Sequence, residues 1–146
     1  MGRQSFEVVN ASSAAPEAVF ALLADGSRWS EWAGPLVRRS AWDREGTPEP
    51  GGVGAIRRLG SAPFYSREEV VEYEPPHRLS YVLLSGMPVR DYRADVDLIP
   101  DGAGTQIRWR SSFAPKIPGT GPLVRALMAG IVGGFARRLA VAAARG

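Results

Sequence analysis

Few residues in this sequence could carry acid–base, nucleophilic or metal chemistry. The chain contains no cysteine, and His77 is its only histidine. These counts exclude a disulfide framework, thiol catalysis, thiolate metal sites and a multi-histidine metal centre, so we expect neither a cofactor nor a metal. His77 follows Pro75 and Pro76 in a turn between two expected strands, where exposure is normal. An intermediate pKa is a property of any free histidine, so we interpret His77 as a turn residue and name no catalytic residue.

Aromatic residues with polar ends form a second set of candidates, and their chemistry would be ligand recognition. Residues 91–98 read DYRADVDL, in which Tyr92 shares the apolar positions with Ala94 and Val96. This period of two indicates a strand with one dry face. Buried tyrosine and tryptophan need partners for their polar atoms, which a cavity with water or ligand supplies more readily than a packed core; both explanations stay open. The candidates on the dry faces of expected strands are Tyr81, Leu83, Tyr92, Trp109 and Phe113.

Charged residues alternate along residues 65–74, and the pattern allows two interpretations. The more apolar phase groups Arg67 and Glu69 with Tyr65 and Tyr73. If that phase faces inward, Arg67 and Glu69 line the concave side of the sheet, where an unpaired charge is costly. The two charges would then either orient the polar group of a ligand or pair at the margin of the sheet, and we favour the margin.

Periodicity and turn signals predict the elements that must position these candidates. Short helices are expected at residues 16–24, where Pro16 suits a helix start, and at residues 27–34, where Ser27 suits a cap. Strands joined by short turns pair as an antiparallel meander. The expected strands cover residues 4–10, 36–44, 54–60, 65–74, 78–85, 91–98 and 105–113.

A long helix is expected at residues 121–145. A long helix after a curved antiparallel sheet buries its apolar face by lying across the concave side, so Met128 and Phe135 become candidates for a pocket wall. Trp29 and Trp32 share a face of the second short helix; we expect one to fill the edge of the sheet and the other, Trp32, to lie at the pocket mouth. The apolar positions of the long helix, at helical spacing, are Val124, Leu127, Met128, Ile131, Phe135 and Leu139.

Three glycines, Gly130, Gly133 and Gly134, fall in the middle of this long helix. An interior helical glycine costs about 1 kcal/mol relative to alanine. Close contact between helix and sheet is one explanation for them. A compliant section that opens to admit a ligand, or a seat for a second subunit, are the other two.

Composition and charge limit the expected partners and location. The net charge is +3, and Lys116 is the single lysine among 18 basic residues, a skew typical of a GC-rich genome. The arginines are scattered among acidic residues, whereas nucleic-acid sites gather basic residues with aromatic platforms. The start of the chain has no apolar signal core, and no later run reaches the ~20 apolar residues of a spanning helix. We therefore expect a cytoplasmic protein, a monomer or homodimer, that binds no nucleic acid and does not insert stably into a membrane.

The order of elements and three stretches of sequence resemble the START/Bet v 1-like superfamily, in the branch called polyketide cyclase/dehydrase or SRPBCC proteins. The resemblance covers nearly the whole chain and implies one domain over residues 1–146. It also implies an α+β helix-grip fold, in which a curved seven-stranded antiparallel sheet, two short helices and a long C-terminal helix enclose an apolar pocket. In that family the pocket serves lipids, sterols, polyketides and other hydrophobic molecules. The three stretches are SAAPEAVFALLADGSRWSEWAG (13–34), EEVVEYEPPHRLSYVL (68–83) and VRDYRADVDLIPDGAGTQIRWRSSF (89–113).

Fold alone does not decide function, and three classes stay open. The first, which we favour, is binding of a small hydrophobic molecule between sheet and helix. The second is a polyketide cyclase or dehydratase that uses a Tyr, Arg or Glu for proton transfer in the same pocket. The third is an interaction module whose groove takes a partner segment. The expected ligand-binding residues are Trp32, Arg67, Glu69, Tyr81, Leu83, Tyr92, Trp109, Phe113, Met128 and Phe135.

Overall fold

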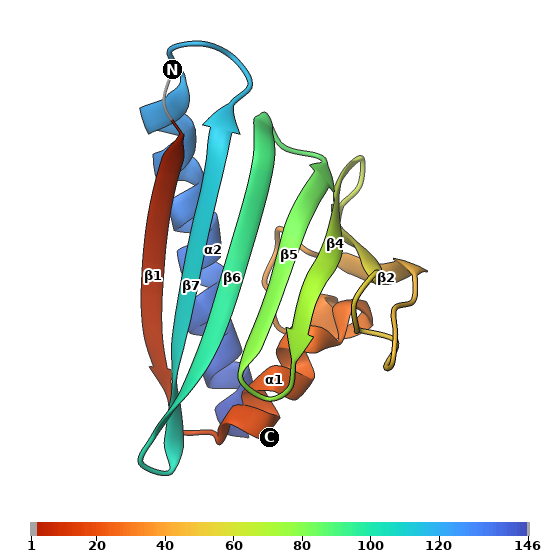
Figure 1. Cartoon of the computed structure of the whole chain (residues 1–146), viewed down its shortest axis with the longest axis vertical. Helices are drawn as coiled ribbons and strands as arrows, with labels where there is room; N and C mark the ends of the chain where they lie inside the picture. The colour runs from red at the N-terminus through yellow and green to blue at the C-terminus, as the bar shows by residue number, and fades with distance from the viewer. Residues whose placement is uncertain (1–2, 146) are drawn as a thin grey trace.

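A computed structural model describes residues 3–145 of the chain. Its seven strands form one sheet in the order β1-β7-β6-β5-β4-β3-β2, in which each strand is antiparallel to its neighbours (Figure 1). The strands are β1 (Gln4–Ser12), β2 (Arg39–Arg44), β3 (Ile56–Ser61), β4 (Phe64–Glu74), β5 (Arg78–Ser85), β6 (Val89–Asp101) and β7 (Gly104–Pro115).

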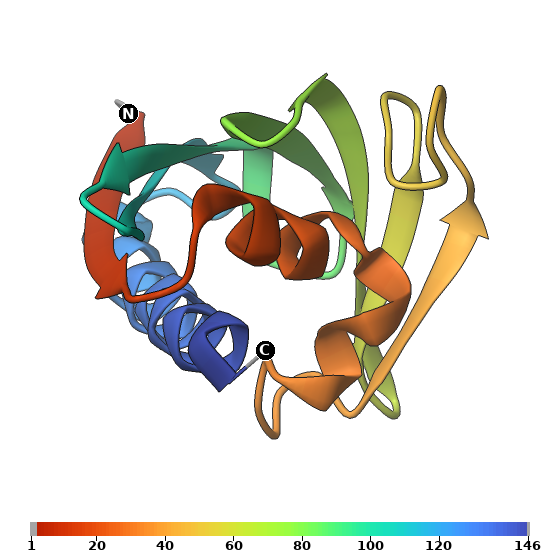
Figure 2. The same ribbon diagram turned by 90° about the horizontal axis from the view of Figure 1, so that it is seen from below.

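The long helix α2 (Gly121–Arg145) lies behind the sheet and runs along its length (Figure 1). Seen from below, the sheet is strongly curved. The helix α1 (Pro16–Ala24) and the 3₁₀ helix η1 (Gly26–Glu31) cross its open side (Figure 2). This arrangement is the helix-grip fold, so the predicted fold class is confirmed. The second short helix begins one residue earlier than predicted, because the carboxylate of Asp25, rather than Ser27, caps it; Asp25 Oδ1 accepts the Ser27 N–H at 3.1 Å.

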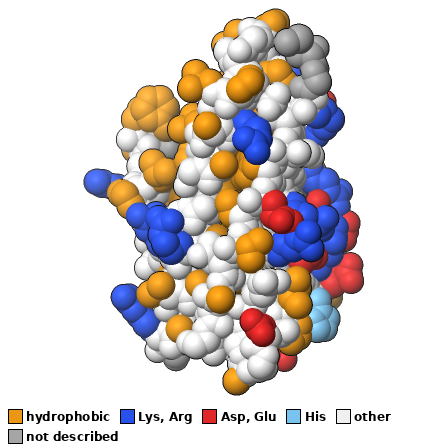
Figure 3. Space-filling view, turned by 90° about the vertical axis from the view of Figure 1, so that its left-hand side faces the viewer, with side chains coloured by type: hydrophobic (Ala, Val, Ile, Leu, Met, Phe, Trp, Pro, Cys, Tyr) orange, Lys and Arg blue, Asp and Glu red, His pale blue; other side chains and the backbone are white. Residues whose placement is uncertain are grey.

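Strict alternation in β6 separates an inner face from an outer face, as its sequence predicts. The inner positions are buried, whereas Asp95 and Asp97 point outward. On the outer face Arg78 reaches Asp95 at 2.9 Å and Asp97 at 3.2 Å, and Arg110 reaches Asp97 at 2.7 Å. Acidic and basic side chains therefore gather together along this face, at the right-hand edge of Figure 3.

The buried face of α2 is slightly rotated from the predicted one. Val124, Met128 and Leu139 are buried as expected, but Leu127 is exposed and Val132 takes a place in the core. By length and composition alone α2 could also cross a membrane, which a count of uninterrupted apolar residues did not indicate. Here its apolar face packs against the sheet, as in the core helix of a folded domain.

A β-bulge near Val70 and Glu72 changes the phase of β4. Before the bulge Glu68 and Val70 are buried, and after it Tyr73 packs against the ring of Phe20 in α1, with ring centroids 5.4 Å apart. An extra residue in one strand moves all later side chains to the opposite face. Neither single phase considered for residues 65–74 is therefore correct along the whole strand.

Candidate functional site

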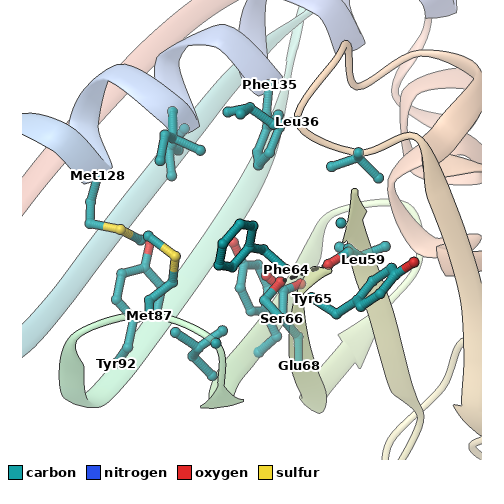
Figure 4. Close-up of a pocket in the computed structure, with 17 residues that line it drawn as sticks. Leu36, Leu59, Phe64, Tyr65, Ser66, Glu68, Met87, Tyr92, Met128 and Phe135 are labelled. Atoms are coloured by element: carbon teal, nitrogen blue, oxygen red, sulfur yellow. Dashed lines mark hydrogen bonds between the residues drawn. The ribbon is translucent and has the colours of Figure 1, made fainter. Parts of the chain in front are cut away.

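A cavity of about 190 Å³ lies between the sheet and the middle of α2 (Figure 4). Its walls come from β3, β4 and β5, from the start of β6, and from α2. Two loops complete it: one follows η1, and the other, between β5 and β6, contains Met87. Most of the wall is apolar, and the polar side chains on it are few.

Five of the predicted ligand-binding residues lie on the wall of this cavity. β5 contributes Tyr81 and Leu83, β6 contributes Tyr92, and α2 contributes Met128 and Phe135. In the close-up, Met128 descends from the helix toward Tyr92 and Met87 at one end, and Phe135 lies beside Leu36 (Figure 4). The inward phases of two strands and the stripe on α2 therefore meet at one place.

Trp109 and Phe113 do not line the cavity; both are fully buried behind it. The ring of Trp109 meets that of Tyr81 edge-on, with centroids 6.4 Å apart, and Phe113 stacks on Tyr92 at 6.1 Å. The expectation that the dry face of β7 borders the cavity is thus wrong. These rings belong to the packed hydrophobic core, and they contact the two tyrosines that line the cavity.

Trp32 is also absent from the cavity wall. It is buried, and its ring contacts that of Trp29 with centroids 4.6 Å apart. Trp29 in turn packs edge-on against Phe135 at 5.4 Å. Both tryptophans therefore close the core beneath η1, and the predicted place of Trp32 at the mouth is not observed.

Arg67 and Glu69 point away from the cavity. Arg67 Nε lies 2.8 Å from Asp43 Oδ2, and Glu69 Oε2 lies 3.1 Å from Arg44 Nη2, so both reach across β3 to pair with the edge strand β2. Because residues before the bulge in β4 present the opposite phase, Glu68 takes the inward position instead. The favoured pairing at the margin is observed, although with β2 and not between Arg67 and Glu69.

Glu68 and its partner Arg57 are the charged residues that sequence reasoning missed. The two are paired across β3 and β4, and Arg57 Nη2 lies 2.8 Å from Glu68 Oε1. Arg57 is completely buried and does not border the cavity, whereas Glu68, 7 % exposed, lies on the wall. A signal was present, because Arg57 shares the phase of Leu59 and Glu68 shares the phase of Val70 in the sequence.

The guanidinium of Arg57 is held on several sides. Its Nη1 donates to the carbonyl of Leu23 at the end of α1 at 2.9 Å. Its Cζ lies 4.7 Å from the ring centroid of Trp29 and 5.1 Å from that of Tyr81. A cation over aromatic faces is stabilised when it is desolvated. Burial raises the pKa of Glu68, and the attraction of Arg57 opposes that rise without cancelling it.

Two buried tyrosines add hydroxyl groups to the wall, which also includes the partly buried side chains of Tyr65 and Ser66. Burial raises the pKa of Tyr81 well above its usual value, and the nearby carboxylate of Glu68 raises it further. Burial also raises the pKa of Tyr92, whose hydroxyl donates a hydrogen bond to Ser111 Oγ at 2.9 Å. Both tyrosines therefore keep their protons at neutral pH and present hydroxyl groups rather than phenolates.

Apolar residues in loops and turns form the mouth, and these too were missed. Phe64, the first residue of β4 and 80 % exposed, and Leu36, 55 % exposed after η1, both border the cavity. Leu36 and Val37 lie outside β2, although the sequence placed them in a strand. The signal for this group was the presence of large apolar side chains next to or within turns, such as Phe64 and Met87, where polar residues are usual.

Within residues 3–145, no cluster of His, Asp and Glu side chains could hold a metal ion. His77 is exposed in the β4–β5 turn, as predicted, and it does not border the cavity. The arrangement can thus bury an apolar molecule and offer it one carboxyl group and two buried tyrosine hydroxyls. Glu68 and the tyrosines are the groups on this wall that can exchange a proton with such a molecule.

The sequence matches the family model described as polyketide cyclase/dehydrase and lipid transport over residues 3–144. No curated protein matches the sequence.

Solved structures share the fold at low sequence identity. A START superfamily protein from Mycobacterium smegmatis superposes with a TM-score of 0.82 at 15% identity, covering 99% of each chain. A solution structure from Thermobifida fusca has a TM-score of 0.77 at 20% identity, covering 97% of this chain and 93% of that one. Norcoclaurine synthase from Thalictrum flavum, in complex with a transition-state analogue, has a TM-score of 0.75 at 13% identity, covering 99% and 96%. At these identities the likeness is one of fold.

Proposed function

Because the chain belongs to the polyketide cyclase/dehydrase and lipid transport family, we propose that it binds a small hydrophobic molecule in the cavity beneath α2. The observation that carries this proposal is the cavity itself, about 190 Å³ of mostly apolar space bordered by sheet, helix and two loops. Well-packed interiors hold few voids larger than a water molecule. A void of this size is therefore better explained as a binding site than as a packing defect.

The volume bounds the ligand. An engineered apolar cavity of roughly 150 Å³ in another protein stays dry and binds benzene. A cavity of about 190 Å³ thus suits a molecule with one or two rings, or a short branched chain. Longer skeletons would have to extend through the mouth, where the exposed side chains of Phe64 and Leu36 offer apolar contact.

The charge distribution favours a small-molecule partner over a nucleic acid. Arginines on the outer face of the sheet, among them Arg78 and Arg110, are paired with carboxylates of β6. Paired arginines do not form the basic stripe that phosphate backbones require.

We propose that the protein acts in the cytoplasm and that α2 stays packed on the sheet rather than entering a membrane.

Titration with the neutral fluorophore 1-aminoanthracene tests the proposal. We expect saturable binding at one molecule per chain, with a blue-shifted emission typical of an apolar site. Ile131 borders the cavity from α2 and is only partly buried, so Ile131→Trp should fill the space and abolish binding. The matched control is Val141→Trp on an exposed part of the same helix, which should bind as the wild type does. Unsaturable binding, or equal loss in both variants, would overturn the proposal.

Catalysis by a cyclase or dehydratase remains the second candidate, and one observation favours it. Glu68 is a buried carboxyl on the cavity wall whose pKa is raised by burial, and such a group can exchange a proton with a bound molecule. Mass spectrometry of ligands after incubation separates the two functions. A carrier returns its ligand unchanged. A dehydratase returns a product lighter by one water, and Glu68→Gln should abolish that change.

A further inference from the structure

The buried polar side chains of the cavity wall all come from the sheet, whereas Tyr65 and Ser66, which also line the cavity, are only partly buried. Glu68, Tyr81 and Tyr92 border the space from three adjacent strands. Glu68 Oε1 is engaged by Arg57 at 2.8 Å, whereas Glu68 Oε2 accepts no hydrogen bond from the residues that the structure describes. This second oxygen is therefore free to exchange a hydrogen bond with a ligand that reaches the wall.

The positive charge of Arg57 is out of reach of such a ligand. Arg57 has no exposed surface and does not border the cavity. Its Nη1 is directed to the carbonyl of Leu23, its Nη2 to Glu68, and the rings of Trp29 and Tyr81 flank its plane. No lysine or arginine lies on the described cavity wall. An anionic ligand would find no cation to pair with.

The hydroxyls of Tyr81 and Tyr92 can also form hydrogen bonds with a ligand, one as a donor and the other as an acceptor. Tyr81 is 2 % exposed and keeps its proton, because burial and the charge of Glu68 both raise its pKa. It can therefore donate to an oxygen of the ligand. The proton of Tyr92 is already given to Ser111 at 2.9 Å, which leaves the Tyr92 oxygen as an acceptor.

Resting on the proposed function, we infer that the cavity selects an apolar molecule bearing a neutral hydroxyl group and rejects the corresponding carboxylate. A hydroxyl donates one hydrogen bond and accepts others, so it can donate to Glu68 Oε2 while accepting from Tyr81. It also fits a protonated Glu68, which would simply reverse the direction of their bond. An ether or hydrocarbon cannot donate and leaves the wall unsatisfied. A carboxylate would place a second negative charge beside Glu68 in a poorly solvated site.

Four ligands with one skeleton test this selectivity by calorimetric titration near pH 7: 2-naphthol, 2-methoxynaphthalene, 2-naphthoate and naphthalene. Hydrogen bonds to charged groups are worth more than neutral ones, so we expect 2-naphthol to bind at least about tenfold more tightly than its methyl ether. We expect 2-naphthoate to bind at least about tenfold more weakly than 2-naphthol. Equal affinities for naphthol and its ether, or tighter binding of naphthoate, would overturn the inference.

A pair of adjacent variants assigns the effect to Glu68. Glu68→Gln removes the charge but keeps an oxygen for Arg57, so the preference for 2-naphthol over 2-naphthoate should shrink by about tenfold. Glu69→Gln makes the same change on the outer face, where Glu69 pairs with Arg44, and should leave the preference unchanged. If Glu68→Gln alters the preference no more than Glu69→Gln does, the inference fails. Should Glu68→Gln not fold, the four ligands with the wild-type protein still decide.

The same titrations separate this inference from the proposed function. If naphthalene and its ether bind at one per chain without any advantage for the hydroxyl, the cavity is a ligand site and only the selectivity is wrong. If none of the four compounds binds and 1-aminoanthracene does not saturate, the proposed function itself is wrong.

Discussion

Arg57 Nη2 and Glu68 Oε1 lie 2.8 Å apart inside the protein, and the sheet places the two residues directly opposite each other on β3 and β4. Arg57 also binds the carbonyl of Leu23, at 2.9 Å. The guanidinium of Arg57 thus connects Glu68 on the cavity wall to the end of α1. The pair fixes the orientation of the only carboxyl group on the described cavity wall.

Breaking this pair from one side should destabilise the protein strongly. Arg57→Ala leaves the carboxyl of Glu68 buried without a partner, and loss of one member of a buried pair typically costs about 3–5 kcal/mol. The double variant Arg57→Met/Glu68→Leu removes both charges and should recover most of that loss. Urea unfolding followed by circular dichroism measures both free energies of unfolding.

The neighbouring surface pair provides the control for that experiment. Arg44 and Glu69 lie 3.1 Å apart, and 56% and 32% of their side chains are exposed. Exposed ion pairs contribute about 0–1 kcal/mol, so Glu69→Ala should lower the free energy of unfolding by less than about 1 kcal/mol. Similar losses for Arg57→Ala and Glu69→Ala would show that Arg57 and Glu68 are not structurally coupled as described.

The pH dependence of stability should carry the sign of a raised carboxyl pKa. Burial raises the pKa of Glu68 above its usual 4.5, so the folded state holds a proton that the unfolded chain has already lost. Between these two pKa values the free energy of unfolding falls as pH rises. Glu68→Gln lacks this contribution, so as pH rises from about 4 through the raised pKa of Glu68, the free energy of unfolding of the variant should increase relative to that of the wild type. Urea unfolding across that range measures the difference.

The pKa of Asp95 is lowered, so the effect of Asp95 on the pH dependence of stability should have the opposite sign. Burial alone would raise its pKa, but hydrogen bonds from Ser80 and Arg93 and the charges of Arg93 and Arg78 together lower it. Its contribution to stability is therefore present above its usual pKa of 3.8 and lost as pH falls through the lowered value. The deficit of Asp95→Asn should shrink toward acid pH, whereas that of Glu68→Gln should shrink toward neutral pH. Parallel curves for the two variants would contradict both assignments.

The elements were predictable because their signals are local. Alternation in residues 91–98 identified the centre of β6 (Val89–Asp101), and helical spacing identified α2 at its observed bounds. Turn residues such as Asp101 and Gly102 marked the hairpin between β6 and β7. Each of these signals depends on a few neighbouring residues and not on the rest of the fold.

The site was less predictable because non-local features decide it. The bulge that allows both Glu68, before it, and Tyr73, after it, to face inward appears only when β4 pairs with β5. Leu36 joins the wall from a loop, where no periodicity exists to indicate its direction. Trp109 has the alternation of a wall residue, yet it packs against the ring of Tyr81 and does not line the cavity. Sequence phase predicts which face a side chain occupies, but not whether that part of the face is filled.

Two of the three glycines in α2 should be replaceable with a gain in stability. A Cβ at Gly130 would meet nothing within 4 Å, and one at Gly133 would touch only Val8 Cγ1 at 3.8 Å. Close contact with the sheet therefore does not require glycine there. Gly130→Ala and Gly133→Ala should each raise the free energy of unfolding by up to about 1 kcal/mol, by helix propensity.

Gly134 and ligand kinetics complete the test of the glycines. A Cβ at Gly134 would lie 3.1 Å from Arg138 Nη1, so Gly134→Ala should gain less than Gly133→Ala. If the glycines make the roof of the cavity compliant, Gly133→Ala should also slow the association of 1-aminoanthracene in stopped-flow measurements. Higher stability with an unchanged association rate would leave no role for compliance.

The hydrogen bond between Tyr92 and Ser111 should account for the effect of removing the Tyr92 hydroxyl. The hydroxyl donates to Ser111 Oγ at 2.9 Å, and both residues are buried. Tyr92→Phe should therefore lower the free energy of unfolding by about 0.5–1.5 kcal/mol, the usual net value of one hydrogen bond. Ser111→Ala should cost a similar amount. The double variant should cost less than the sum of the two, because the second substitution removes a group that has already lost its partner. Additive losses in this cycle would mean that the two hydroxyls act independently. The hydrogen bond to Ser111 would then not be what holds Tyr92 in place on the cavity wall.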